Sequence, residues 1–386
     1  MTLLSIFSRL EDPRRGPAKR YGLREILVMA ICAVLCGADD WVEVAEWCED
    51  EADWLKGFLD LPQGTPSHDT FGDVFRVLDP DVFESCFREW IGGLVGVVKD
   101  IIALDGKTVR GSKDGAIPPL HLVSAYATAL GLTLGQEGVA GKGNELKAIR
   151  TLLDTWVLNG CIITLDALGC QTDIAAAIVE KGGDYVLAVK ANQKTLSEAL
   201  VESFETGEAL GWGKVDVHCQ TTVEKNHGRI ETRRAVLVPK IDWLPEAIRT
   251  AWPTLGAVGM IETTQEKGTG EGATISTDRR YFILSRGVTT VGDFARAVRA
   301  HWGVESMHWV LDVTFREDAC RVRKEGAARN LSLLRKITLA MLRLDTAYPK
   351  SSLRQRRNRA SRKPLYRAEL LGLRPRSQPG TTKSIK

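Results

Sequence analysis

The chain has 386 residues, of which 26% are charged and 44% hydrophobic, a composition typical of a globular protein and not of a disordered one. A chain of this length can bury a large core and is expected to hold two or three structural units. The net charge of +3 is unevenly distributed. Residues 349–386 carry twelve Lys and Arg residues against the single acid Glu369, so the rest of the chain, with 40 basic and 48 acidic residues, sums to about −8.

The basic C-terminal tail, residues 346–386, has two interpretations. Clustered basic side chains can neutralise several phosphates of a polyanion, with an affinity that falls as salt rises. On that interpretation Arg356 and Arg357 are candidate DNA contacts. A solvated tail without a partner explains the same composition.

The cysteines and the apolar runs indicate the compartment. Eight cysteines lie scattered without paired CxxC spacing, which favours buried thiols in a reducing compartment over disulfides or a zinc cluster. The chain does not open on a charged-then-apolar leader, and its longest apolar run, residues 26–36, is too short to span a bilayer. We therefore expect a cytoplasmic protein.

Residues 1–97 are predicted to form a helical domain. Apolar residues recur at helical spacing over residues 23–36, 41–58 and 81–97. Between the last two segments Pro66 breaks the chain, and Ser67 or Asp69 can cap the helix that follows.

From residue 98 the pattern changes to short apolar runs separated by turns. Strands are predicted over residues 100–104, 121–129, 132–139, 161–165 and 185–189, with helices over 144–156 and 171–180. The order β-β-β-α-β-α-β is that of an α/β ribonuclease H-like core, a mixed five-stranded sheet with flanking helices. In that fold the first and fourth strands are neighbours, so Asp105 and Asp166 should meet although 61 residues separate them.

A β-rich insertion is predicted to interrupt this core. Alternating segments occupy residues 214–223, 230–239, 259–264 and 280–285, within an insertion of about 195–288. Helical patterns resume over 291–313 and 327–344. The catalytic domain is therefore expected to span residues 98–345, with the basic tail after it.

Three carboxylates stand out in this arrangement: Asp105 and Asp166, each at the end of a predicted strand, and Glu305 within the helix 291–313. An acid at the end of a buried strand is costly unless its desolvation is offset, which favours a shared divalent cation site. Oxygen ligands favour Mg²⁺ or Mn²⁺ over zinc. Two ions about 3.5–4 Å apart could activate a water or a 3′-hydroxyl and stabilise the leaving oxygen. Each acid alone could equally be an ordinary surface residue; the set of three in this order favours the site.

Polar residues near these acids are candidate DNA contacts. Lys107 lies two residues beyond Asp105 and faces the same side if the strand continues, so it is either a phosphate contact or a surface lysine. Lys190, Asn192 and Gln193 follow the fifth strand at the sheet edge of Asp166. Arg229 and Arg233 share one strand face with Glu231, an arrangement that is either a solvated charge ladder or a grip on DNA. On the helix, Asp312 lies near the face of Glu305 and is a candidate second-shell acid or additional ligand.

The chain resembles the DDE transposases of bacterial insertion sequences, in the ISAs-type subgroup that contains the H-repeat-associated proteins found beside Rhs elements. The matching segments run from the N-terminal region to about residue 345: residues 66–71, 104–112, 142–145, 164–171, 183–193, 227–233, 301–313 and 317–318. The resemblance implies that Asp105, Asp166 and Glu305 are the catalytic triad and that residues 1–97 are an accessory, DNA-binding domain. Arg110 lies in a matching segment and is counted among the DNA contacts.

One departure concerns the helix that carries the glutamate. The wider superfamily has a Tyr, an Arg and a Lys there at fixed offsets, whereas this chain has Val298, His301 and Asp312. The resemblance therefore makes His301 a candidate phosphate contact in place of arginine.

The function expected from the resemblance is transposition. The protein would bind the terminal inverted repeats of its own element, cleave DNA with two Mg²⁺ or Mn²⁺ ions in the active site, and join the 3′-hydroxyl to target DNA as a homodimer. The alternatives are a catalytically silent DNA-binding protein of transposon origin and a metal-dependent nuclease without end specificity.

Overall fold

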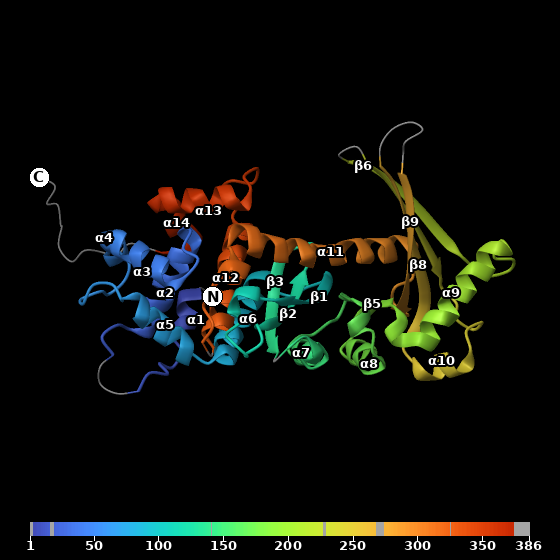
Figure 1. The fold of residues 1–386 in the computed structure, drawn as a ribbon, viewed down its shortest axis with the longest axis horizontal. Helices are drawn as coiled ribbons and strands as arrows, with labels where there is room; N and C mark the ends of the chain where they lie inside the picture. Colours follow the sequence, from blue (N-terminus) through green and yellow to red (C-terminus); the bar gives the residue numbers. More distant parts are fainter. Residues whose placement is uncertain are drawn as a thin grey trace, which may run out of the picture.

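The computed structural model describes residues 3–15, 19–139, 141–226, 229–267, 274–324 and 326–373 (Figure 1). Its N-terminal part is helical, as predicted, and capping side chains fix where helices begin. Asp40, Ser67 and Asp79 each accept hydrogen bonds from backbone N–H groups of the first turn that follows. The helices are α1 (Leu3–Phe7), α2 (Leu23–Cys36), α3 (Trp41–Asp50), α4 (Ala52–Lys56), α5 (His68–Val77) and α6 (Pro80–Val95).

Five strands follow in the predicted order and lie side by side as β3-β2-β1-β4-β5. The pairings of β1 with β2 and of β2 with β3 are antiparallel, whereas β1 with β4 and β4 with β5 are parallel. The neighbouring first and fourth strands are thus confirmed. The strands are β1 (Ile101–Thr108), β2 (His121–Ala127), β3 (Leu132–Val139), β4 (Ile162–Leu165) and β5 (Asp184–Val189).

The insertion extends the sheet, which corrects the expectation of five strands. Over the described residues the sheet has nine strands and continues from β5 in the order β9-β8-β7-β6. An edge strand exposes unpaired backbone groups, and β9 covers the edge of β5 by antiparallel pairing, with Val186 opposite Leu284. The added elements are α9 (Lys194–Ala209), β6 (His218–Asn226), β7 (Arg229–Val238), α10 (Glu246–Ala251), β8 (Leu255–Lys267) and β9 (Thr274–Ser285).

Helices cover both faces of the sheet. In Figure 1 the long helix α11 (Val291–Thr314) runs along one side, from the insertion strands towards the N-terminal helices. Helices α7 (Glu145–Asp154) and α8 (Thr172–Glu180) lie on the opposite side. The first turns of α11 pack through Phe294 and Ala297 on the insertion strands, and its later turns contact β1.

The C-terminal helices join this body to the N-terminal helices. Helix α12 (Ala327–Leu344) is buried along nearly its whole length and contacts α2, α5, α6 and β3. The described part of the predicted tail is folded and not extended: α13 (Leu353–Arg362) and α14 (Pro364–Leu371) pack on α2 and α12. Residues 374–386 lie outside the described residues.

Two sequence expectations concern thiols and membranes. All eight cysteines are free, and all are fully or partly buried except Cys219, which lies on the sheet's edge strand β6. Within the described ranges no helix is both long and apolar enough to cross a membrane.

Candidate active site

Asp105 and Asp166 come together because their strands are parallel neighbours. Leu104 of β1 is opposite Leu165 of β4, and each aspartate is the next residue in its chain. The carboxyl ends of parallel strands meet at one edge of a sheet, so both carboxylates lie at that edge. Asp105 is half-buried and Asp166 is exposed.

Glu305 reaches the same region from α11, which packs against both β1 and β4. Burial, together with the negative charges of Asp166, Glu305 and Glu145, raises the pKa of Asp105 to about 7. The three predicted acids are therefore close enough to interact electrostatically. A carboxyl group with this pKa in the company of other acids favours a nearby cation.

The loop after Asp166 is fixed by two residues that follow β5. Asp166 caps a short 3₁₀ turn, its Oδ1 accepting from the N–H groups of Leu168 and Gly169. Asn192 Nδ2 donates to Ala167 O (2.6 Å), and Gln193 Nε2 donates to Cys170 O (2.9 Å). Asn192 and Gln193 thus hold the loop of Asp166, while Lys190 beside them is exposed.

Three residues at this site were not assigned from the sequence. His308 Nδ1 lies 3.5 Å from Asp105 Oδ2, and burial lowers the pKa of His308 to about 3, so the imidazole is neutral. On the other side of β1, the buried His121 Nε2 lies 2.6 Å from Glu145 Oε1. Glu145 and His308 lie in the matching segments 142–145 and 301–313, whereas His121 lies in none. Their contacts could not be predicted because the partner of each residue is remote in the chain.

The donor set fits a hard divalent cation, although the carboxylates are not assembled around a common point. In the part of the chain that the structure describes, no three His, Cys, Asp or Glu side chains are gathered closely enough to hold a metal ion. Oxygen donors of this kind are the ligands that Mg²⁺ prefers. Burial and the nearby acids raise the pKa of Asp105, and a bound cation would offset both effects. Asp105, Asp166 and Glu305 are the residues that would hold it.

Lys107 has no free ammonium for a phosphate. Its side chain is 9% exposed, and Nζ lies 2.7 Å from Asp312 Oδ1, 3.2 Å from Glu317 Oε2 and 2.9 Å from Asp318 Oδ1. Asp312 is paired with this lysine. The expected phosphate contact of Lys107 is at odds with this burial, and we do not propose it.

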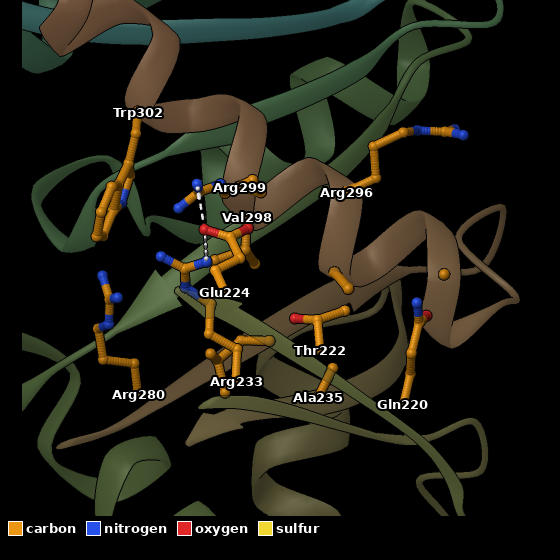
Figure 2. A pocket seen from close by; sticks show the side chains of 13 residues that line it. Gln220, Thr222, Glu224, Arg233, Ala235, Arg280, Arg296, Val298, Arg299 and Trp302 are labelled. Atoms are coloured by element: carbon orange, nitrogen blue, oxygen red, sulfur yellow. Dashed lines mark hydrogen bonds and ion pairs between the residues drawn. The ribbon is translucent and has the colours of Figure 1, made fainter. Parts of the chain in front are cut away.

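Arg233 and Arg280 of the insertion and Arg299 of α11 border a cavity of about 240 Å³ between α11 and strands β6 to β9, and His301 is not among its lining residues. Figure 2 shows Arg233, Arg280 and Arg299 around Trp302, with Glu224 linked to Arg233 and Arg299. Arg233 also pairs with the buried Glu231, so this ladder is largely desolvated, whereas Arg229 is about half exposed. His301 Nδ1 is hydrogen-bonded to Thr164 Oγ1 at 2.9 Å, and burial lowers the pKa of His301.

Arg356 and Arg357 are buried in the protein. Arg356 donates to the backbone oxygens of Leu342 and Asp345, and Arg357 donates to those of Val34, Ala38 and Thr314. A guanidinium held in this way cannot reach a phosphate without leaving these partners. This placement is at odds with the expected DNA contacts, because the arginines close helix ends and do not line a surface. Arg110, in contrast, is 84% exposed.

Comparison with known proteins identifies the family. Residues 97–341 match the family described as "Transposase DDE domain", and residues 4–91 match the family described as "DDE_Tnp_1-associated". "Putative transposase YncI" of Escherichia coli O157:H7 is 37% identical over 96% of this chain and 94% of its own length. "H repeat-associated putative transposase YhhI" of Escherichia coli K12 is 36% identical over 96% of this chain and 97% of its own length.

Among solved structures, a piggyBac transposase synaptic complex with hairpin DNA covers 98% of this chain and 82% of its own. Its sequence identity is 10% and its TM-score is 0.41. The sequence relatives and the family match carry the assignment. The chain belongs to the DDE transposase family, in the subgroup of the H-repeat-associated proteins.

Proposed function

We propose that the protein is an active DNA transposase. It binds the terminal inverted repeats of its own element, cleaves a DNA strand at each end and joins the freed 3′-hydroxyl to target DNA. The observation that carries this proposal is the meeting of Asp105 and Asp166 at one sheet edge under the helix of Glu305, where burial and the neighbouring acids raise the pKa of Asp105. A DNA substrate also implies that the protein works at the nucleoid.

The proposed catalytic residues are Asp105, Asp166 and Glu305, which would hold Mg²⁺ or Mn²⁺. When bound, two such ions would lower the pKa of an attacking water or 3′-hydroxyl and stabilise the leaving oxygen. The protein's own part is to orient the carboxylates: β1 and β4 fix the aspartates, and Asn192 and Gln193 hold the loop of Asp166. The neutral His308 packs beside Asp105 without adding charge.

DNA contacts are proposed for accessible groups near these acids. Arg110 and Lys190 are exposed, and Arg229 is partly so. Arg233 borders the cavity beside Trp302, and His301 lies in α11 four residues before Glu305. Two transposon ends must be held together during transposition, so we propose a homodimer on DNA.

A strand-cleavage assay tests the function. We expect the wild-type protein with Mg²⁺ to nick a labelled duplex that carries the element's inverted repeat, and not a duplex with a scrambled end. Asp105→Asn, Asp166→Asn and Glu305→Gln should each lower the cleavage rate at least about 100-fold, because charge stabilisation at the reacting phosphate is lost. Binding of the repeat, followed by gel shift, should persist.

Glu198→Gln is the matched control, since this glutamate is exposed on α9. It should cleave like the wild type. Cleavage of scrambled ends at equal rate would indicate a nuclease instead, and repeat binding without any cleavage would indicate a silent DNA-binding protein. Full activity of the Asp166→Asn variant would refute the role given to that residue.

A further inference from the structure

A basic hollow lies next to the candidate active site, and of its lining residues only Arg110 has a role in the function proposed so far. Its volume is about 660 Å³, and it is formed by the loop after β1 and the loop after α11. Four basic side chains line it: Arg110, Lys113, Arg321 and Arg323. Among its described lining residues Asp318 is the one acid.

The two loops are fixed against each other. A Cβ atom at Gly111 would lie 2.1 Å from Cys320 O and 2.7 Å from Asp318 O, so only glycine allows this approach. Arg323 Nε donates to Gly111 O at 3.2 Å, and the Arg110 N–H donates to Asp318 Oδ1 at 3.2 Å. The walls of the hollow are therefore held by backbone contacts and do not depend on a ligand.

The negative charge of Asp318 is already offset. Its Oδ1 lies 2.9 Å from Lys107 Nζ, and its Oδ2 lies 3.5 Å from Arg110 Nε. Arg323 has a further acidic neighbour, the half-exposed Asp114 at 3.6 Å. Even with these pairs, the lining keeps an excess of positive charge that faces solvent, since Lys113 and Arg321 are exposed.

The position of the hollow relates it to the catalytic carboxylates. Arg110 comes five residues after Asp105, and Lys107 between them ties β1 to Asp312 near the end of α11. The arginines around Trp302 lie on the other side of Glu305 along the same helix. Arg299 and Asp312 are separated by thirteen residues, or roughly 20 Å of helix. Positive surfaces thus lie on both sides of Glu305.

We infer that the hollow formed by Arg110, Lys113, Arg321 and Arg323 binds the phosphate backbone of double-stranded DNA beside the cleavage site. This inference rests on the proposed function. From the sequence, Lys107 was a candidate contact for the DNA backbone. The inference assigns this contact to arginines and a lysine of two neighbouring loops instead. Arginine suits this task because its planar guanidinium can donate two parallel hydrogen bonds to a phosphate.

The test measures binding to a random-sequence duplex of about 30 base pairs as a function of salt concentration. Each lost phosphate contact lowers the slope of log affinity against log salt by about one. We expect the full-length Arg321→Gln/Arg323→Gln variant to lose about two from this slope, and the Arg110→Gln/Lys113→Gln variant to do the same. The two variants alter different loops. If a thermal melt shows that one of them is misfolded, the other still tests the inference.

The matched control is Lys147→Gln/Lys240→Gln, which removes the same charge from exposed lysines on α7 and after β7. It should keep the wild-type slope. An unchanged slope in the folded loop variants, or an equal loss in the control, would overturn the inference. The salt slope is measured without cleavage, so it tests the hollow separately from the proposed function. If the slope of the loop variants is unchanged but the wild type nicks its inverted repeats, only the inference about the hollow fails. If the slope changes but the repeats stay uncut, only the proposed function fails.

Discussion

At the scale of single residues, burial decides what a charged side chain can do. Lys107 follows Asp105 by two positions in a strand, and the two side chains point to the same side, as the sequence indicated. That side is covered by the end of α11 and the turn after it, so the ammonium meets three carboxylates instead of solvent. A buried ion pair is costly to break because the remaining charges lose their partner.

The substitution Lys107→Met should therefore lower the free energy of unfolding by about 3–5 kcal/mol. The salt slope of duplex binding should stay unchanged, because no phosphate contact is lost. Urea denaturation and salt titration measure the two quantities. Lys190→Met is the contrasting variant because Lys190 is exposed. It should have little effect on stability and should reduce the salt slope of duplex binding by about one. A stable Lys107→Met protein with a reduced slope would restore the phosphate role.

His308 makes stability depend on pH. Its pKa falls from 6.5 to about 3 on folding, because burial disfavours the imidazolium. Below pH 6.5 the unfolded chain takes up a proton that the folded protein does not, so stability is lost as the pH falls from 6.5 towards 3. At pH 5 the loss should be about 2 kcal/mol.

The comparison of the wild type with His308→Gln isolates this effect. The difference in their free energies of unfolding, measured in urea at pH 7 and pH 5, should shift by that amount in favour of the variant at pH 5. Other titrating groups are shared by both proteins and cancel. An equal difference at both pH values would show that His308 is protonated in the folded protein.

At the scale of elements, the joint between β1, β2 and α7 depends on a missing side chain. His121 of β2 and Glu145 of α7 meet over Gly106 of β1. A Cβ atom at Gly106 would lie 2.7 Å from His121 Nε2 and 2.9 Å from the Glu145 carboxyl group. The glycine next to Asp105 thus lets a helix pack close to the strand that carries this acid.

Gly106→Ala should destabilise the protein by about 1–3 kcal/mol, because two buried, paired side chains must move. Gly143→Ala serves as the control, since a Cβ atom there meets nothing within 4 Å and the backbone is not left-handed. Its melting temperature should remain within a degree or two of the wild type. Equal melting temperatures for the two variants would show that the His121 and Glu145 side chains can move aside without a loss of stability.

At the scale of the whole molecule, the accessory helices and the sheet share one hydrophobic core. Side chains of α2, α6, β1 and α12 belong to one contiguous buried cluster. Polar groups reinforce it: Asn330 of α12 donates to the carbonyls of Phe75 and Leu78, and Arg335 donates to that of Asp39. The N-terminal helices are therefore packed in one body with the sheet.

Unfolding should accordingly be a single cooperative transition in calorimetry. Arg357→Gln removes bonds from α13 to carbonyls of α2 and α11 and the ion pair with Asp39, so it should shift the whole transition by about 3 kcal/mol or more. Arg354→Gln, exposed on the same helix, should leave it in place. Two separated transitions, with only one affected by Arg357→Gln, would contradict a shared core.

The sequence by itself determined the local pattern and the order of elements. Strand-ending acids at 105 and 166, helical spacing around 305 and the order of strands predicted which chain segments meet, because parallel strands place their carboxyl ends at one edge. Capping residues such as Ser67 marked a helix start, because one short side chain can satisfy the first free N–H groups. These features depend on neighbours within a few residues.

Only the tertiary structure decided what surrounds each charge. The spacing of Lys107 and Arg357 is that of exposed cations, yet their partners come from α11, α2 and the turn after α11, far away in the chain. The same holds for the pairing of β5 with β9 across the insertion and for the closeness of His308 to Asp105. Burial and ion pairing depend on which distant segments pack together. The periodicity of one segment does not indicate which other segment packs against it.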